Sequence, residues 1–324
     1  MRSNSPYIVA DIGGTNARFG LVTGTNSDQK KLQIDQQRTF PSNDFDNLEQ
    51  VARHYMESLG EVKLSGACLA VAGPVTGDSV RLTNLNWAFS ISDVKRALNL
   101  SKLKVINDFA AYAYATPFID SSNLISLNEG QSIEGSSIAV VGPGTGFGVA
   151  ALVPNGNSWT VLPTEGGHIT LSNKTTLQQS VIQALSTEFS HISIETLLSG
   201  PGLINLYRGL AKVEGINPEN LRASQISQGA LQDPSSLEYR CLKLFCAWLG
   251  QAVGDLALAL GARGGVYLGG GMLLRFVDFF IGSDFMNRFL AKGQMQEYLH
   301  QMPVKLVTEG NSALLGAAAW FEHN

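Results

Sequence analysis

Three glycine-rich turns in this sequence have a composition that suits phosphate binding. They are Gly13-Gly-Thr-Asn16, Gly142-Pro-Gly-Thr-Gly146 and Gly269-Gly-Gly271, and each follows a short apolar run. Glycine tolerates positive φ and leaves backbone N–H groups accessible to an anion. Two of the turns also contain a threonine hydroxyl, and an aspartate lies two residues before the first turn. A single turn of this kind is most simply a tight hairpin, but three together favour a nucleotide-binding cleft between lobes.

These turns match neither of two widespread nucleotide-binding patterns. No Gly-Lys pair occurs in the chain, so the Walker pattern GxxxxGK[ST] is absent. Between Gly142 and Gly148 the glycines fall at every second position rather than as GxGxxG. The residues after that turn predict a strand, whereas a dinucleotide fold requires a helix there. These observations disfavour a nicotinamide-dependent dehydrogenase.

One candidate acid–base group lies where a predicted strand meets a predicted helix. Asp108 closes the strand predicted at Lys104–Asp108, directly after Asn107, and precedes the helix predicted at Phe109–Ala115. A carboxylate in such a place can act as a general base. Aspartate is also a favoured N-cap, and the residues alone make capping the simpler interpretation.

A second group of polar residues has a spacing compatible with a metal cluster. It consists of Glu165-x-x-His168 and His191-x-x-x-Glu195. However, the HExxH pattern is absent, and Gly166-Gly167 places the first pair on a turn rather than on one helix face. We therefore do not expect a metal-dependent hydrolase, and we interpret His191 as structural.

Alternating strands and helices must position these residues. A predicted strand, turn and strand over 7–22 form a hairpin, and the same design recurs over 137–153. We interpret the two hairpins as the start of two related halves of an α/β protein, with a boundary near Pro117. Ser92 is expected to cap a helix that it begins. The other predicted strands are 67–72, 104–108, 265–268 and 304–307, and the predicted helical segments are 45–59, 92–98, 109–115, 175–198, 239–261, 272–280 and 313–321.

Composition limits the classes of function. The 324 residues carry a net charge of −4, and 15% of them are charged, against about 25% in an average soluble protein. This excludes a disordered chain and a basic nucleic-acid footprint, and no uncharged apolar run is long enough for a membrane span. The three cysteines cannot form a disulfide framework, and no CxxC pair suggests a zinc site. We expect a cytoplasmic protein with neither nucleic-acid nor membrane partners.

Several segments together resemble the bacterial glucokinases, within the superfamily of sugar kinases, heat-shock ATPases and actin. The order and spacing match from about residue 7 to about residue 319. The Cys-rich zinc motif of the repressor and kinase branch of sugar kinases is absent, so the match is to the zinc-free group. The resembling segments are Asp11–Arg18 and Gly142–Gly148 for the two phosphate loops, Leu268–Met272 for the adenosine turn, and Ile106–Phe109, Thr164–His168 and Glu195–Gly202 for sugar binding.

The resemblance implies two actin-like (ribonuclease-H-like) α/β lobes with an interlobe cleft. It implies a small domain of residues 1–117 plus about 308–324, because the C-terminal helix of the family returns to the first lobe. A large domain of about 118–307 would lie between these segments. The family commonly dimerises, so we expect a homodimer.

The resemblance also implies a glucokinase activity: ATP and D-glucose give ADP and glucose 6-phosphate, with Mg²⁺ as cofactor, at the entry to glycolysis. Asp108 would be the catalytic base that accepts the proton of the sugar's 6-hydroxyl. The implied sugar ligands are Asn107, Asp108, Glu165, His168 and Glu195; the implied ATP-binding residues are Asp11, Gly13, Gly14, Thr15, Asn16, Gly144, Thr145, Gly269, Gly270 and Gly271; and Asp11 would face Mg²⁺ through water.

Three alternatives stay open. A kinase of another hexose would share all of these motifs. A non-catalytic sugar sensor on the same fold would need neither Asp108 nor Asp11. A different actin-like ATPase would lack the Asn107-Asp108 and Glu165/His168 pairs, and it would hydrolyse ATP without sugar.

Overall fold

The chain divides into two compact units. The computed structural model describes residues 5–26, 31–82, 85–156, 158–310 and 312–323. Unit 1 comprises residues 1–120 and 309–324, and unit 2 comprises residues 121–308.

Unit 1 is built on a five-stranded sheet in the order β3-β2-β1-β4-β8. The first three strands along the chain are antiparallel neighbours, and β4 and β8 then add in parallel to β1. The apolar residues of β1 and β4 are buried, which accounts for their short β-branched and alanine-rich sequences. The strands are β1 (Tyr7–Ile12), β2 (Asn16–Asn26), β3 (Lys31–Pro41), β4 (Ala67–Val71) and β8 (Leu103–Asn107).

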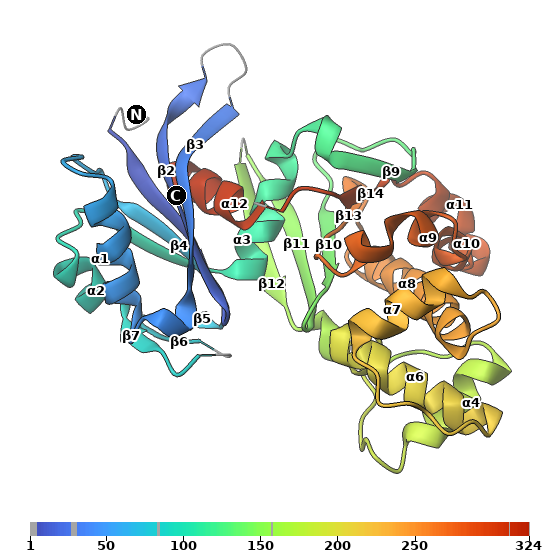
Figure 1. The fold of residues 1–324 in the computed structure, drawn as a ribbon. Coiled ribbons are helices and arrows are strands. Elements are labelled where there is room, and N and C mark those ends of the chain that lie inside the picture. Colours follow the sequence, from blue (N-terminus) through green and yellow to red (C-terminus); the bar gives the residue numbers. More distant parts are fainter. Residues whose placement is uncertain (1–4, 27–30, 83–84, 157, 311, 324) are drawn as a thin grey trace. The chain divides into compact units, whose positions relative to one another are not determined.

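Helices cover both faces of this sheet, as Figure 1 shows. Helices α1 (Leu48–Ser58) and α2 (Ile91–Ala97) lie on one face, and α3 (Asp108–Ala115) and the C-terminal α12 (Ser312–His323) lie on the other. A small separate sheet is formed by β5 (Val75–Thr76), β6 (Ser79–Arg81) and β7 (Ala88–Ser90). Single turns of 3-10 helix are η1 (Ser42–Asp44) and η2 (Thr116–Phe118).

The contact between α3 and α12 is very close. A Cβ atom added to Gly316 of α12 would lie 1.7 Å from the Ala111 carbonyl oxygen of α3. Because α3 begins at Asp108, this contact holds the helix that carries the predicted catalytic base.

Unit 2 repeats the strand order of unit 1. Its sheet has the order β12-β11-β10-β13-β14-β9, in which an antiparallel trio is again followed by parallel strands, and β9 is added at the edge. Both units therefore have the ribonuclease-H-like order of actin-like lobes, and the prediction of a duplicated α/β unit is confirmed. The strands are β9 (Leu124–Asn128), β10 (Ile138–Pro143), β11 (Phe147–Asn155), β12 (Ser158–Thr164), β13 (Gly265–Leu268) and β14 (Val304–Val307).

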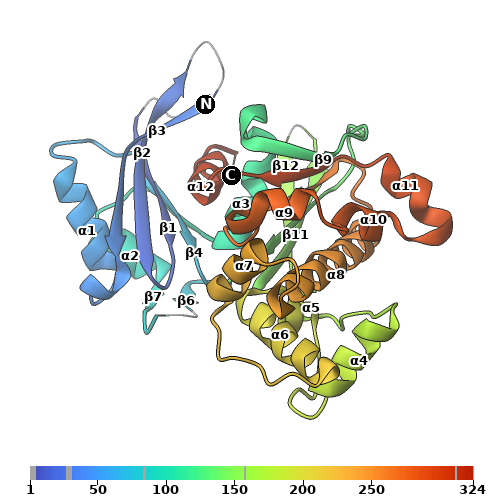
Figure 2. The ribbon, with the colours of Figure 1, turned by 45° about the vertical axis from the view of Figure 1, so that its right-hand side comes forward.

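The core of unit 2 is built around one long helix, α8 (Leu237–Ala259). Helices α6, α7 and α8 lie side by side in Figures 1 and 2. By length and composition α8 could cross a membrane, but 72% of its apolar window is buried, as in a core helix. Cys241 and Cys246 are fully buried in it and pack as small core residues. The other helical segments are η3 (Ser121–Asn123), η4 (Gly166–His168), α4 (Thr176–Leu185), α5 (Ile194–Leu198), α6 (Gly200–Glu214), α7 (Ala223–Gln232), η5 (Leu273–Phe276), α9 (Val277–Ile281), α10 (Phe285–Leu290), η6 (Gly293–Met295) and α11 (Gln296–His300).

Several predicted helix starts differ from the structure by one to three residues, and in two of them the capping residue changes as well. Helix α2 begins at Ile91, and its N-cap is Ser90, whose hydroxyl accepts from Asp93 N–H at 3.1 Å. Asp108 is the first residue of α3 rather than the last residue of a strand. In both cases the capping side chain lies before the residue that the local sequence favoured, because the preceding backbone is already extended there.

Candidate active site

The first glycine-rich turn, between β1 and β2, is held by a residue from outside the motif. Gly13 N–H donates to the Asn16 carbonyl at 2.9 Å and closes the turn. The buried Ser42 hydroxyl donates to the Gly13 carbonyl at 2.9 Å, and Ser42 N–H donates to the Thr15 carbonyl at 2.9 Å. Gly14 is half-buried, and the side chains of Thr15 and Asn16 are exposed. Ser42 is a positioning residue that the sequence did not indicate, because it looks like one polar residue in a loop.

Asp11 lies beside this turn and has an ion-pair partner. The register of β1 and β2 places it opposite Arg18, and Arg18 Nη1 is 3.7 Å from Asp11 Oδ2. Burial raises the pKa of Asp11, while the Arg18 guanidinium lowers it. Mg²⁺ prefers carboxylate oxygens and keeps several of its waters, so it needs few protein ligands. Asp11 therefore fits a magnesium site by its donor chemistry.

Asn107 is the N-cap of α3, a role that the sequence favoured for Asp108. Its Oδ1 accepts from Ala110 N–H at 3.0 Å. Its Nδ2 donates to the Gly73 carbonyl and to Asp108 Oδ1, both at 3.1 Å. Phe109 N–H donates to the same Asp108 oxygen at 2.7 Å. These bonds fix the Asp108 carboxylate at the start of the helix and release it from capping.

The environment of Asp108 makes it a stronger base than a free carboxylate. Burial raises its pKa from 3.8 to about 6, and the nearby Asp11 carboxylate adds to the rise, although the bonds from Phe109 N–H and Asn107 oppose it. The two carboxylates share one sheet edge because β1, β4 and β8 are parallel and in register. A carboxyl group with this pKa is mostly ionised at pH 7 and still accepts a proton readily.

In unit 2, the two glycine-rich turns that were predicted to bind phosphate and adenosine are neighbours. Strands β10 and β13 are parallel, and Gly269 N–H donates to the Val141 carbonyl at 2.8 Å. Gly270 has φ +90°, and a Cβ there would lie 2.4 Å from the Pro143 carbonyl oxygen, so only glycine fits. The structure thus brings Gly144, Thr145 and Gly269–Gly271 to the same sheet edge.

A pocket of about 450 Å³ opens beside these two turns. Of the predicted residues, Gly144, Thr145 and Gly271 line it. Sequence reasoning missed the rest of its wall, which combines apolar side chains with one hydroxyl and one exposed guanidinium, a composition that suits a nucleotide. These other lining residues are Gly200, Pro201, Leu203, Ile204, Ala223, Ser227, Met272, Arg275 and Phe276. Met272 ends the segment that resembles the adenosine turn, and Gly200 and Pro201 lie in a segment that was assigned to the sugar. No local pattern marks the others.

The three sugar-binding candidates of unit 2 gather around the backbone of Phe147. Glu165 immediately precedes the single 3-10 turn η4, and His168 is its last residue. The two side chains are exposed, with His168 Nε2 3.8 Å from Glu165 Oε2. Gly167 packs so closely that a Cβ would lie 2.2 Å from the Phe147 carbonyl oxygen. On the other side, Glu195 Oε2 accepts from Phe147 N–H at 2.7 Å.

The alternative of a metal cluster at these residues finds no support. Within the described part of the chain, no three His, Cys, Asp or Glu side chains gather as metal ligands would. The His191 ring instead contacts the backbone of the predicted sugar-binding segment, with Nε2 3.0 Å from the His168 carbonyl oxygen. This agrees with a structural role for His191.

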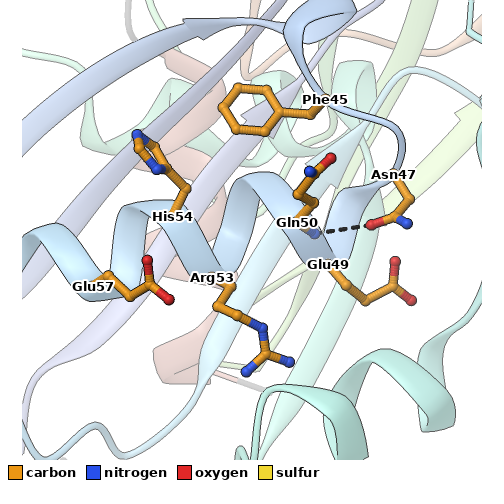
Figure 3. Close-up of a pocket in the computed structure, with 7 residues that line it drawn as sticks. All are labelled: Phe45, Asn47, Glu49, Gln50, Arg53, His54 and Glu57. Atoms are coloured by element: carbon orange, nitrogen blue, oxygen red, sulfur yellow. Dashed lines mark hydrogen bonds between the residues drawn. The ribbon is translucent and has the colours of Figure 1, made fainter.

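A second pocket, of about 420 Å³, lies over helix α1 in unit 1 (Figure 3). The side chains that line it are largely engaged in packing: the His54 ring lies 5.6 Å from that of Phe45 and 5.3 Å from that of Phe40. Arg53 donates to the Ala97 carbonyl at 2.8 Å. None of the predicted site residues lines this pocket.

Comparisons with known proteins agree with the site residues in pointing to one family. The family model described as Glucokinase matches residues 8–324. A glucokinase of Saccharophagus degradans is 45% identical over 317 residues, which are 98% of each chain. A glucokinase of Salmonella typhi is 42% identical over 96% of this chain and 95% of its own. The crystal structure of a glucokinase from an Antarctic psychrotroph has 47% identity and a TM-score of 0.93, covering 99% of this chain and 100% of that one. This chain belongs to the glucokinase family.

Proposed function

We propose that this chain is an ATP-dependent glucokinase that transfers the γ-phosphoryl group of ATP to the 6-hydroxyl of D-glucose. Membership of the glucokinase family supports the reaction. The structural observation that carries the proposal is the Asp108 carboxylate, with its pKa raised to about 6 by burial and its position fixed by Asn107. A protein that only binds sugar has no need for such a base.

In the proposed mechanism Asp108 accepts the proton of the 6-hydroxyl as that oxygen attacks the γ-phosphorus. The bond between the γ-phosphorus and the bridging oxygen breaks, and ADP leaves with its new negative charge. Phosphoryl transfer needs mainly alignment and charge neutralisation, and a positioned base contributes about 10²–10⁴-fold. Asn107 acts as a positioning residue for Asp108. When sugar binds, one N–H of its side-chain amide would donate a hydrogen bond to a sugar hydroxyl instead of to its present acceptor.

The glycine-rich loops would hold the nucleotide. Gly14 N–H and the hydroxyls of Thr15 and Thr145 can donate to phosphate oxygens. The N–H groups of Gly13 and Gly144 instead close their loops, because they donate to the carbonyls of Asn16 at 2.9 Å and Gly146 at 2.8 Å. Asn16, exposed beside Thr15, is a further donor. The pocket beside Gly269–Gly271 would take the adenosine, since it is lined by apolar side chains, by glycines and by a few polar groups.

Three side chains of unit 2 would bind the sugar: those of Glu165 and His168, which are exposed, and that of Glu195, which is half-buried. Glu165 and Glu195 would accept hydrogen bonds from adjacent sugar hydroxyls, and the His168 imidazole would hydrogen-bond to one further hydroxyl. A site built from such groups rejects an analogue that leaves them unpaired.

Magnesium is proposed as the cofactor. When bound with ATP it would neutralise phosphate charge. Asp11 is the residue that would hold it, through water, and Arg18 limits the approach of a second cation to the same carboxylate.

We further propose that units 1 and 2 are the two domains of the enzyme and that it works as a homodimer in the cytoplasm. D-glucose and ATP would be its partners, with no nucleic-acid or membrane partner. The burial of α8 supports a protein that does not insert this helix into a bilayer. Light scattering on the purified chain measures the dimer directly: a mass near 34.7 kDa would contradict it.

The proposal is tested by ADP release with Mg–ATP, first without sugar and then with glucose, mannose, fructose, galactose or N-acetylglucosamine. We expect a strong rise with glucose and a requirement for divalent metal that excess chelator removes. A rise with another sugar alone would change the substrate but keep the kinase. Sugar-independent hydrolysis would indicate an ATPase, and glucose binding without turnover would indicate a sensor.

A further inference from the structure

The second phosphate loop is attached at both ends to one short segment of unit 2. At its start, Gly200 N–H donates to the Gly144 carbonyl at 2.8 Å. At its end, Phe147 N–H donates to Glu195 Oε2 at 2.7 Å. The Ser199 hydroxyl ties these two anchors together, because it donates to the Glu195 carbonyl at 2.8 Å and accepts from Gly202 N–H at 3.0 Å. The loop that carries Thr145 therefore moves with the segment 195–200.

One carboxylate oxygen of Glu195 bonds to the loop, and the other is available to a ligand. Its Oε2 is committed to Phe147 N–H, whereas Oε1 has no hydrogen bond within the described residues. Gly146 makes the close approach feasible, since a Cβ there would lie 2.6 Å from Oε2. The carboxylate is half-buried, so a ligand can still reach it.

We propose that Glu195 couples sugar binding to ATP binding by bridging a sugar hydroxyl and the second phosphate loop. The proposal rests on the proposed glucokinase function and adds a regulatory link within that site. A sugar hydroxyl that donates to Oε1 restricts the rotation of the carboxylate. Oε2 then holds Phe147 N–H more firmly, and the loop with Thr145 becomes ordered for the phosphates. By linkage, ATP on the loop orders the same carboxylate for the sugar by the same factor.

Glu165 provides the matched control within the same unit. It is also a carboxylate proposed to bind sugar, but its side chain is 91% exposed and its nearest charged partner is His168. Within the described residues it makes no bond to the phosphate loop. Replacing it should weaken glucose binding without changing the link to ATP.

The test is isothermal titration calorimetry with a non-hydrolysable ATP analogue and Mg²⁺, with and without saturating glucose. In the wild-type chain we expect glucose to tighten analogue binding by about fivefold or more, the lower end of typical coupling. In Glu195→Ala, the ratio of the analogue Kd without glucose to that with glucose should fall to about one. Glu165→Ala should leave this ratio unchanged and raise only the glucose Kd. Glu195→Gln, which keeps an oxygen to accept from Phe147 N–H, should retain part of the ratio. Gly146→Ala should reduce it as well, because the methyl group displaces Oε2 from the loop.

A structural readout separates coupling from a simple loss of sugar affinity. Hydrogen exchange at the Phe147 amide should slow when glucose saturates the wild-type chain, and it should be fast with or without glucose in Glu195→Ala. If Glu195→Ala does not fold, Gly146→Ala carries the same test. Equal analogue affinity with and without glucose in the wild type, or an unchanged ratio in both variants, would overturn the coupling. Failure of the wild-type chain to phosphorylate glucose would instead overturn the proposed function.

Discussion

Replacing Asp108 by asparagine should stabilise the protein while it removes the activity. The folded chain holds the pKa of Asp108 at about 6, above the 3.8 of an exposed aspartate. The ionised carboxylate is therefore disfavoured in the folded state. The destabilisation caused by ionising Asp108 is absent below the pKa of this group in the unfolded chain. It grows as pH rises from 3.8 to about 6 and is constant above that. Asparagine has no charge to desolvate, and its Oδ1 can keep the bonds from Phe109 N–H and Asn107.

The size of the effect follows from the same pKa. Holding a carboxyl group at about 6 rather than 3.8 costs the folded state about 3 kcal/mol at pH 7 and about half of that at pH 5. We expect Asp108→Asn to raise the free energy of unfolding by up to these amounts, and to lower kcat by about 10²–10⁴-fold. The assay is urea unfolding of the wild type and of Asp108→Asn at pH 7 and pH 5, monitored by circular dichroism.

Asp78 provides a control, because its pKa is shifted in the opposite direction to that of Asp108. Bonds from Ser90 and Ser92 hold the pKa of this exposed carboxyl below its usual value, so Asp78→Asn should be neutral or destabilising at pH 7. If Asp108→Asn were no more stable than the wild type at pH 7, or if its gain were the same at both pH values, the burial argument for Asp108 would be refuted.

Further predictions concern the same base and the contacts that position the site. The value of kcat/KM for glucose should fall about tenfold per pH unit below about pH 6, and an acid limb near pH 4 would show that Asp108 titrates as an exposed group. Ser42→Ala should raise the KM for ATP several-fold with little change for glucose, because the first phosphate loop loses a buried bond worth about 1 kcal/mol; an unchanged KM for ATP would remove Ser42 from the site. Gly316→Val should destabilise unit 1 by about 1–3 kcal/mol or more, because its side chain overlaps the Ala111 carbonyl. The matched control, Gly310→Ala, adds a methyl group in open space and should leave the melting temperature nearly unchanged.

Elements whose two faces are buried were predictable from the sequence. The strands at 7–12 and 265–268 match the structure because their residues are mostly apolar and are followed by glycine turns. Strands β3 and β12 were missed, since they are exposed along much of their length and carry polar residues without a clear period. Helix α6 was missed because Gly200-Pro-Gly looks like a loop, whereas Pro at the first turn and the Ser199 cap begin a helix.

The candidate site residues were found by motif, but their supports were not. Asn107 was predicted to be a sugar ligand, whereas its capping bond to Ala110 N–H and its bond to Asp108 depend on where the helix begins. Arg275 and Ser227 reach the pocket wall only through the packing of η5 and α7. Such contacts join residues that are far apart in sequence, and a local pattern carries no information about them.

The two phosphate loops show how a repeated topology can be adapted for different tasks. Each loop joins the first two strands of the antiparallel trio in its sheet, and each is held by a residue from a distant segment. In unit 1 the support is the hydroxyl of Ser42, which is fully buried and therefore cannot reach a ligand. In unit 2 it is the carboxylate of Glu195, which is half-buried and has a second acceptor oxygen. A buried hydroxyl can only fix its loop, whereas a partly exposed carboxylate can also respond to a ligand. The sensitivity of ATP binding to sugar should therefore reside in the loop of unit 2, and Ser42→Ala should weaken ATP binding equally with and without glucose.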